Sequence, residues 1–231
     1  MPPDGPAAVV IRDVSVLDPG ATTWLRHRDI VIMDTTFTSI TPAGGALPSA
    51  KITIQGAGKF AIPGLFDDRV SLANFTRDSV GLLIANGVTS VRDIGTSPAQ
   101  IAEWRRDVAN GKMMGPRIVD ACETGCGPPR IGASARARHD ELAGLVGERG
   151  ATASAALRAA TIDAANALGR GADLGSIESG KRADLLILTG DPLADIRQTA
   201  SIDAVVFRGE ALTRAHLNML TSRAAAARAG R

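Results

Sequence analysis

The sequence has few of the residues on which enzymes most often rely: it contains no tyrosine, three histidines and two cysteines among its 231 residues. Histidine is a common general base and metal ligand, so a shortage of histidine limits both kinds of site. Cys122 and Cys126 are too few for a disulfide scaffold, and no other cysteine or histidine lies near them in the sequence to complete a metal site. We therefore expect both cysteines to be ordinary thiols.

The sequence also lacks a strong charge of one sign and a long apolar run. Its net charge is +2, which gives no reason to expect a nucleic-acid partner. No apolar run reaches the roughly 18 residues that a membrane span requires. The first residues, MPPDGPAAVV, do not show the pattern of a signal peptide. Together these features predict a cytoplasmic protein with neither nucleic-acid nor membrane partners.

Both ends of the sequence are rich in predicted strands. Residues 8–60 contain short β-branched runs separated by glycine and proline, which indicates a small antiparallel sheet module. ADLLIL and IDAVVFRG return to the same pattern after residue 182. We expect residues 1–61 and 172–213 to pack together as one β-sandwich module. Residues 214–231 predict a C-terminal helix or a disordered tail.

The middle of the chain alternates predicted strands and helices. The segments FAIPGLFD, VTSVRDIG and PRIVDAC are predicted strands. Residues 76–86 are predicted to form a helix that ends at Gly87, and a second helix is predicted with Ser97 as its cap, Pro98 at its first position and Gly111 after its end. This alternation predicts βαβ units and a parallel sheet.

Further predicted elements follow a glycine- and proline-rich loop. RIGAS, residues 130–134, could form a short strand. HDELAGLVGERG is an amphipathic helical pattern, with Leu142, Leu145 and Val146 on one face. Residues 151–169 read as one alanine-rich helix that ends at Gly169.

The predicted strands carry motifs that resemble the amidohydrolase superfamily, particularly its imidazolonepropionase-like and prolidase-like members. FAIPGLFDDRVSLAN resembles the first barrel strand of the family, GVTSVRDIG the second and GPRIVDAC the third. ATASAALRAATIDAANALG followed by LGSIESGKRADLLILTGDPLADI resembles the C-terminal signature. The resemblance covers residues 8–120 and 139–210, nearly the whole chain.

This resemblance implies one or two divalent metals at the carboxyl ends of the barrel strands, which activate water. In the family the ligands are a His-x-His on strand one, a carboxylated Lys or a Glu on strand four, His on strands five and six, and Asp on strand eight. Here Arg69, Val70 and Ser71 stand where His-x-His belongs, and a guanidinium stays protonated and cannot bind a metal. The best match to the strand-eight motif puts Ser134 in place of its Asp. We therefore expect no metal and no other cofactor.

The three histidines do not replace the missing ligands in this interpretation. His27 lies in the predicted sheet module and His216 in the predicted tail. His139 lies at the start of the helix after the segment that matches strand eight, where family members often have a histidine outside the metal site.

The predicted barrel is also too short to close. Nothing that resembles strands four to seven is present, and residues 62–170 are 109 residues, whereas a complete barrel has about 250. The expected fold class is therefore α/β plus β: the split β-sandwich module and, over residues 62–171, a truncated amidohydrolase-like (β/α) barrel. Open strand edges and an uncovered apolar face predict a homodimer. The alternative is that the strands are rearranged and that the sheet module and the tail helix cover the open edge.

Charged and polar residues cluster where the predicted parallel strands end, which is where barrel proteins place their functional groups. The candidate catalytic residues are Asp67, Asp68, Arg69, Arg92, Asp93 and Glu123. The candidate substrate-binding residues are Ser71, Asp120 and Ser134. The competing interpretation is structural: Arg69 would occupy the former metal space as an ion pair, and the loop carboxylates would be solvated.

Three functional hypotheses follow. The first is a metal-independent enzyme that cyclises or isomerises an apolar small molecule, because such chemistry needs a pocket of suitable shape and a few polar groups. Bacterial secondary metabolism is one setting for such an enzyme. The second is a non-catalytic pseudoenzyme that binds or scaffolds. The third, a residual metal-dependent hydrolase, ranks last.

Overall fold

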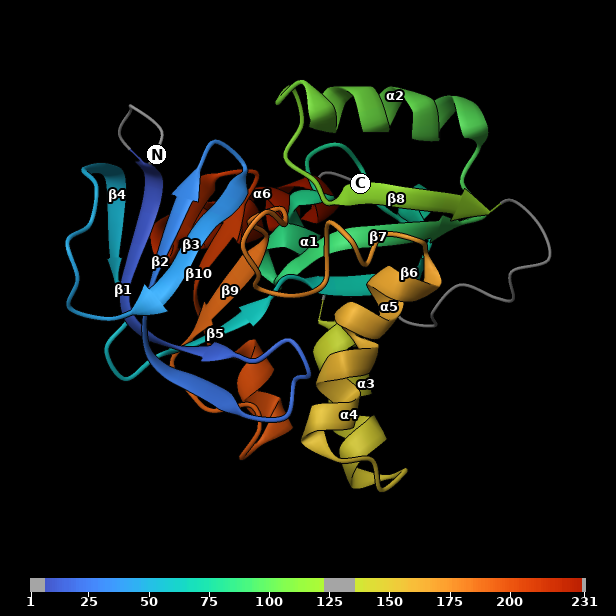
Figure 1. Ribbon diagram of the computed structural model, residues 1–231. Coiled ribbons are helices and arrows are strands. Elements are labelled where there is room, and N and C mark those ends of the chain that lie inside the picture. The colour runs from blue at the N-terminus through green and yellow to red at the C-terminus, as the bar shows by residue number, and fades with distance from the viewer. Residues whose placement is uncertain (1–6, 123–135, 230–231) are drawn as a thin grey trace.

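The computed structural model describes residues 7–122 and 136–229, which form a mixed sheet, a parallel sheet and several helices (Figure 1). Sheet A contains eight strands in the order β11-β10-β9-β5-β1-β2-β3, with β4 also paired to β1. Its strands are β1 (Ala7–Leu17), β2 (Trp24–Met33), β3 (Thr36–Pro42), β4 (Ala50–Gln55), β5 (Phe60–Pro63), β9 (Leu185–Leu188), β10 (Ile202–Phe207) and β11 (Glu210–Thr213). Sheet B has the order β6-β7-β8 and contains β6 (Leu65–Val70), β7 (Val88–Ile94) and β8 (Arg117–Cys122).

Sheet A combines strands from both ends of the chain, because β5 pairs with β9 in antiparallel fashion. The expectation of a purely antiparallel sheet at the N-terminal end is wrong. One stretch of β1, Ala7–Arg12, runs parallel to β4, and the next, Ser15–Val16, runs parallel to β5. Gly56 lies between these two pairings, where its backbone nitrogen donates to the Arg12 carbonyl oxygen at 2.7 Å. A side chain at Gly56 would collide with that carbonyl oxygen and with Val14.

The apolar run FAIPGLFD, expected as one strand, is divided between the two sheets at Gly64. The residues before Gly64 form β5 in sheet A, and those after it begin β6 in sheet B. The Gly64 nitrogen donates to the Asp184 carbonyl oxygen, and the Leu65 nitrogen donates to the Gly87 carbonyl oxygen, each at 2.9 Å. A Cβ at Gly64 would collide with the Thr89 side chain, so only glycine allows this close crossing.

The helices differ from expectation mainly in their bounds. They are α1 (Gly81–Ala85), α2 (Pro98–Ala109), α3 (Ala137–Gly147), α4 (Ala153–Ala159), α5 (Ile162–Ala167) and α6 (Arg214–Ala229), with the 3-10 helices η1 (Leu72–Asn74) and η2 (Ile196–Ala200). The helix expected over 76–86 is reduced to α1. The residues before it form a turn in which the Thr76 nitrogen donates to Ser79 Oγ at 2.8 Å. Gly87, with φ of +75°, follows α1 as expected.

The helix expected over 151–169 is two helices, α4 and α5, with a break at Ala160 and Thr161. The Ala160 carbonyl oxygen accepts a 2.8 Å hydrogen bond from the Phe66 nitrogen of β6. Thr161 Oγ1 donates to the Leu157 carbonyl oxygen at 2.7 Å. Pairing with the edge of sheet B thus competes with helix continuation at this point.

Two helices follow the sequence closely. In α2 the Ser97 side chain caps the first turn by accepting from the Gln100 nitrogen at 3.4 Å, Pro98 begins the helix, and Gly111 has φ of +70°. The C-terminal segment forms α6 through Ala229. RIGAS, the possible strand over 130–134, lies outside the described residues.

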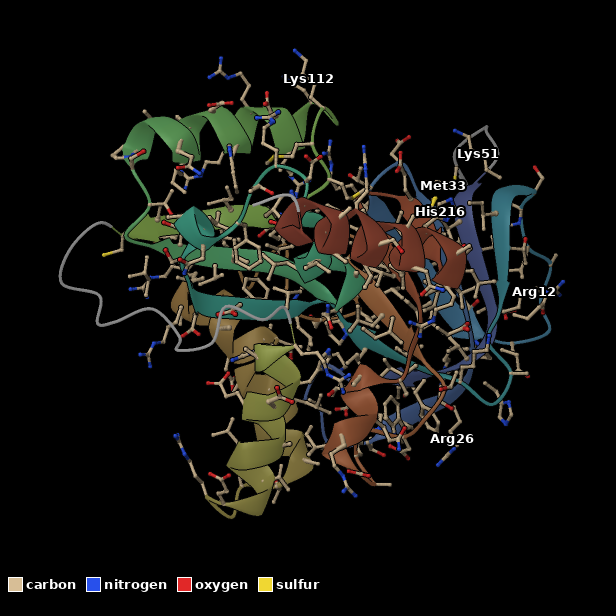
Figure 2. All side chains as sticks on the ribbon, turned by 180° about the vertical axis from the view of Figure 1, so that it is seen from behind. Arg12, Arg26, Met33, Lys51, Lys112 and His216 are labelled. Carbon is tan, nitrogen blue, oxygen red and sulfur yellow. The ribbon has the colours of Figure 1, made fainter. Side chains whose placement is uncertain are left out.

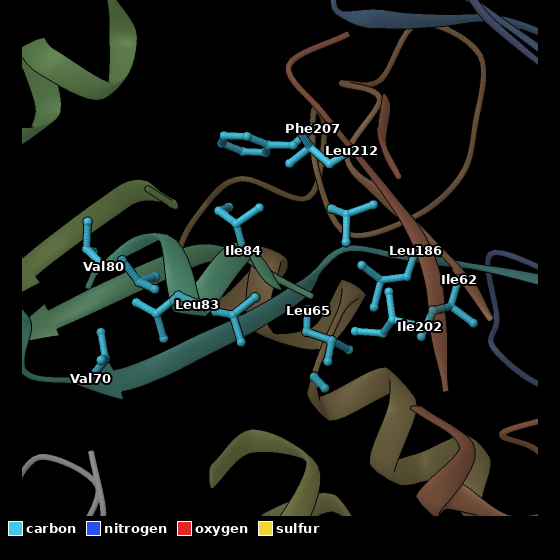
Figure 3. Packing of buried hydrophobic residues seen from close by; sticks show 14 of the residues in the cluster. Ile62, Leu65, Val70, Val80, Leu83, Ile84, Leu186, Ile202, Phe207 and Leu212 are labelled. Carbon is cyan, nitrogen blue, oxygen red and sulfur yellow. The ribbon is translucent and has the colours of Figure 1, made fainter. Parts of the chain in front are cut away.

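The core has two main parts, one on each face of the central strands of sheet A. Along β9, the Leu185 and Ile187 side chains belong to the part of the core on one face of sheet A. The Leu186 and Leu188 side chains belong to the part on the other face, which is shared with sheet B. Figure 3 shows the part of the core that sheet A shares with sheet B, where residues of sheet A, sheet B and α1 interdigitate. Its labelled members are Ile62, Leu65, Val70, Val80, Leu83, Ile84, Leu186, Ile202, Phe207 and Leu212. This shared core fixes sheet B, and with it the candidate site, against sheet A.

Candidate functional site

The carboxyl ends of β6, β7 and β8 meet at one edge of sheet B because the three strands are parallel. Pairing places Asp67 opposite Val91, Val70 opposite Asp93, and Arg92 opposite Asp120. The predicted site residues within the described part of the chain therefore gather at this edge. They are Asp67, Asp68, Arg69, Ser71, Arg92, Asp93 and Asp120. The other two, Glu123 and Ser134, lie outside the described residues.

Asp93 is fully buried and its carboxylate is saturated with local donors. Oδ1 accepts from the Leu72 nitrogen and from Thr96 Oγ1, each at 2.7 Å, and Oδ2 accepts from the Thr96 nitrogen at 3.0 Å. Thr96 Oγ1 in turn accepts from the Ala73 nitrogen at 2.9 Å. Asp93 thus joins the turn after β6 to the turn after β7.

The end of β6 carries three charged residues that differ in their exposure. Asp67 is buried, and its Oδ1 accepts from the Arg69 backbone nitrogen at 3.0 Å. Asp68 is half-buried and Arg69 is exposed. Ser71, half-buried, precedes η1 without capping it through its side chain. Arg69 therefore stands at the strand end as a cation, in the position where the resembled motif has a metal-binding histidine.

Strands β7 and β8 carry a weak ion pair between Arg92 and Asp120. Arg92 Nε lies 3.8 Å from Asp120 Oδ2, which is an ion pair but too long for a hydrogen bond. Both Arg92 Nε and Ser90 Oγ are buried without a hydrogen-bond partner. These two atoms are the least satisfied polar groups of β7, and buried polar groups of this kind are uncommon.

Cys122, the last residue of β8, is disulfide-bonded. This corrects the expectation of an ordinary thiol at that position. Cys126 lies outside the described residues.

All three histidines of the sequence are described, and each lies away from the carboxyl edge of sheet B. His27, on β2, is exposed with its Nδ1 2.7 Å from Asp13 Oδ1. His216 lies in the first turn of α6, where its Nδ1 accepts from the Thr213 nitrogen at 3.3 Å.

His139, in the first turn of α3, is buried. Its Nδ1 lies 3.0 Å from Thr199 Oγ1 and its Nε2 3.0 Å from the Asn86 carbonyl oxygen. Burial lowers the pKa of His139 to about 4, so this imidazole is neutral at pH 7. It is a structural link between α3, α1 and η2.

The donor set at sheet B does not fit a hydrolase metal centre. Within residues 7–122 and 136–229, no group of three or more His, Cys, Asp or Glu side chains is arranged to hold a metal ion. The Asp93 carboxylate, at the carboxyl end of β7, already accepts three hydrogen bonds. We therefore derive no reaction step through a metal.

Three grooves lined by described residues lie elsewhere, around α6 and β11. Their volumes are about 780, 620 and 340 Å³. Met114 and Leu212 line all three, and none of the predicted site residues lines any of them. Sequence reasoning missed this region. The available signal was the composition of 214–229, which is basic and alanine-rich with a few large apolar residues.

Comparison with known proteins finds a family match over part of the chain. The family model described as "Amidohydrolase family" matches residues 120–212. The C-terminal part of the chain is therefore similar to this family. N-substituted formamide deformylase of Arthrobacter pascens is 45% identical to this chain over 84 residues, which are 34% of this chain and 15% of the deformylase.

Several solved structures share the fold. A structure assigned as a prolidase, from Bifidobacterium longum, aligns with a TM-score of 0.75 and 17% identity over 95% of this chain and 100% of that chain. Molinate hydrolase aligns with a TM-score of 0.76 and 13% identity over 90% of this chain and 94% of that chain. At these identities the likeness shows the fold alone.

Proposed function

We propose that this protein acts by binding and does not carry out metal-dependent hydrolysis. One observation carries the proposal: His27, His139 and His216, all the histidines of the sequence, lie away from the carboxyl edge of sheet B. Arg69 and Asp93 support it, because a guanidinium does not bind metal ions and the Asp93 carboxylate already accepts three hydrogen bonds.

Hydrolysis assays test this function directly. The probes are an N-substituted formamide and an Xaa-Pro dipeptide, chosen from the names of the matched proteins. Each is incubated with the purified chain in the presence of added Zn²⁺ or Mn²⁺. We expect no turnover above the metal-containing buffer. Metal-dependent turnover that follows the protein concentration would contradict the proposal.

A second candidate is a metal-independent rearrangement of an apolar small molecule. The buried Ser90 Oγ and Arg92 Nε support it, because an oxygen-bearing ligand could satisfy both. Acetate added to ¹⁵N-labelled protein tests whether such an oxygen reaches the pair. A saturable shift of the Arg92 Nε resonance, absent from Arg92→Lys, is expected of this candidate. An unchanged resonance would remove it.

We also propose the domain division given by the sequence. Residues 1–61 with 172–213 form a split β-sandwich module, residues 62–171 a truncated barrel, and 214–231 the C-terminal element. The pairing of β5 with β9 supports the split β-sandwich module, and the three parallel strands of sheet B support the truncated barrel. Hydrogen exchange tests it: β1, β5 and β9 should open together, and independent opening of β9 would contradict it.

A homodimer is a further proposal, based on the incomplete barrel. Each edge of sheet B is partly covered from within the chain: the Phe66 nitrogen donates to the Ala160 carbonyl oxygen, and Arg105 Nε donates to the Ile118 carbonyl oxygen at 3.1 Å. Edge strands of an open sheet are surfaces on which a second copy could pair. Light scattering should give twice the mass of one chain, and the mass of a single chain would contradict the dimer.

The cytoplasmic location stays a prediction. Among the described residues, no helix combines the length and apolar character needed to cross a membrane. The disulfide at Cys122 argues against a cytoplasmic location, because disulfides persist mainly in oxidising compartments. Thiol labelling of the protein in intact cells tests the location: free thiols support the cytoplasm, and blocked thiols contradict it.

A further inference from the structure

The three grooves around α6 share lining residues, and we call them together the α6 groove. Met114 and Leu212 belong to all three parts, and Arg223 belongs both to the largest part and to the smallest. The parts have volumes of about 780, 620 and 340 Å³. These volumes are in the range of small-molecule sites, roughly 300–1,000 Å³.

The floor of the largest part is apolar. Met114, Leu212, Met219 and Leu220 line it. Among the described residues, the large apolar side chains that are exposed are Ile52, at 38%, and Met219, at 58%, and both line the α6 groove. Exposed apolar side chains that gather at one place indicate a ligand or partner surface.

The rim of the α6 groove carries an excess of positive charge. Its cations are Lys51, Lys112, Arg208 and Arg223, and its acids are Asp34 and Glu210. Within the described part of the chain, no ion pair involves any of these cations. Figure 2 shows Lys112, Lys51 and His216 on the face that carries α6. Among the described residues, the rim therefore offers four cations that are in no ion pair, against two acids.

Arg208 and His216 are held in place at this rim. The Arg208 guanidinium donates to the Ala109 carbonyl oxygen at the end of α2, and its backbone has φ of +55° in the turn before β11. His216 uses Nδ1 as an acceptor toward Thr213, so Nε2 is its protonated nitrogen and a donor. Preorganised donors of this kind favour an anionic ligand.

A second copy of this chain fits the α6 groove poorly. The sequence of α6, RAHLNMLTSRAAAARA, has no acidic residue. Two-fold pairing of α6 with α6 would therefore bring arginines against arginines with no acid on the helix to compensate. An occupant with an apolar body and a negative head satisfies both the floor and the rim.

We propose that the α6 groove binds an aliphatic carboxylate. The acyl chain lies against Met114 and Met219 in the largest part. The carboxylate lies near Arg223, where the apolar part meets the smaller, basic part that includes Lys112 and Arg208. This site is separate from the carboxyl edge of sheet B and does not depend on the function proposed for that edge.

Calorimetric titration with dodecanoate, kept below its micelle concentration, tests the site. We expect one saturable site per chain. Dodecan-1-ol and dodecyltrimethylammonium have the same chain length with a neutral and a cationic head, and each should bind about tenfold more weakly than dodecanoate. Absence of saturable dodecanoate binding, or equal affinity for the cationic analogue, would overturn the proposal.

Two variants and a matched control locate the site. Arg223→Gln should weaken dodecanoate binding about fivefold through loss of the head-group contact. Met219→Gln should weaken it through loss of apolar contact. Arg26→Gln removes an exposed arginine on β2, away from α6, and should change nothing (Figure 2). All three residues are exposed, so the fold should be retained.

The variants also separate the proposed ligand from the other occupants. Unchanged dodecanoate affinity in Arg223→Gln would overturn the proposal, because the carboxylate would then bind elsewhere. Loss of a dimer in Met219→Gln with dodecanoate affinity unchanged would also overturn it, by showing that the α6 groove is an interface between copies.

Discussion

The Asp93 carboxylate, at the end of β7, accepts a 2.7 Å hydrogen bond from the backbone nitrogen of Leu72, which follows β6. Thr96 supplies two more donors to the same carboxylate. A residue expected as a catalytic candidate therefore serves to connect the ends of two parallel strands. A carboxylate that accepts three hydrogen bonds has little capacity left for a substrate.

Asp93→Ala should strongly destabilise the protein. It leaves the Leu72 nitrogen and both Thr96 donors without their acceptor inside the core, so we expect a loss of about 3 kcal/mol in the free energy of unfolding. Urea unfolding measures it. Asp120→Ala is the matched control, since its side chain is 53% exposed, and should cost under about 0.5 kcal/mol. Equal losses in the two variants would contradict the structural role of Asp93.

Gly64→Ala should destabilise the crossing between the sheets. The added Cβ meets the Thr89 side chain, and such overpacking costs about 1–3 kcal/mol. Thr89→Gly in the same chain removes the colliding atoms, so the double variant should recover part of the loss relative to the sum of the single variants. Thermal or urea unfolding of the four proteins gives this coupling. Strict additivity would show that Thr89 does not oppose a side chain at Gly64.

His139 should make the stability depend on pH. Burial holds its pKa at about 4, below the ordinary value of 6.5, so the unfolded chain takes up the proton first as the pH falls. The neutral His139 side chain therefore makes its full contribution to the free energy of unfolding above about pH 6.5. This contribution is lost as the pH falls from about 6.5 to 4 and does not change further below pH 4. The total is about 3 kcal/mol in the free energy of unfolding.

Urea unfolding from pH 7.5 to 4 measures this dependence. His139→Gln cannot take up the proton, so its unfolding free energy should fall less over that range, although its stability at pH 7 is lower. Parallel pH profiles of the two proteins would contradict the low pKa of His139.

Local signals in the sequence predict some elements well. Ser97, Pro98 and Gly111 determine α2 from within its own segment, and the structure has each in its expected role. The amidohydrolase motifs likewise predict a resemblance, which the family model matches over residues 120–212 and which the folds of solved structures share. Both depend on short stretches of sequence and need no knowledge of tertiary contacts.

Other features depend on contacts between distant segments and could not be predicted this way. The division of FAIPGLFD at Gly64 depends on the approach of Thr89, and the break between α4 and α5 depends on the bond from Phe66 to Ala160. At the candidate site, the strand order predicts that the charged residues meet at one edge. The hydrogen-bond donors to Asp93 come from turns whose path the sequence pattern does not define.

The central claim, that this protein has no hydrolytic metal centre, is tested most directly by the metal content of the purified chain. Plasma mass spectrometry, on protein prepared without chelators, gives the amount of zinc, manganese, iron and nickel per chain. We predict far less than one metal ion per chain for each. A content close to one or two ions per chain would contradict the account.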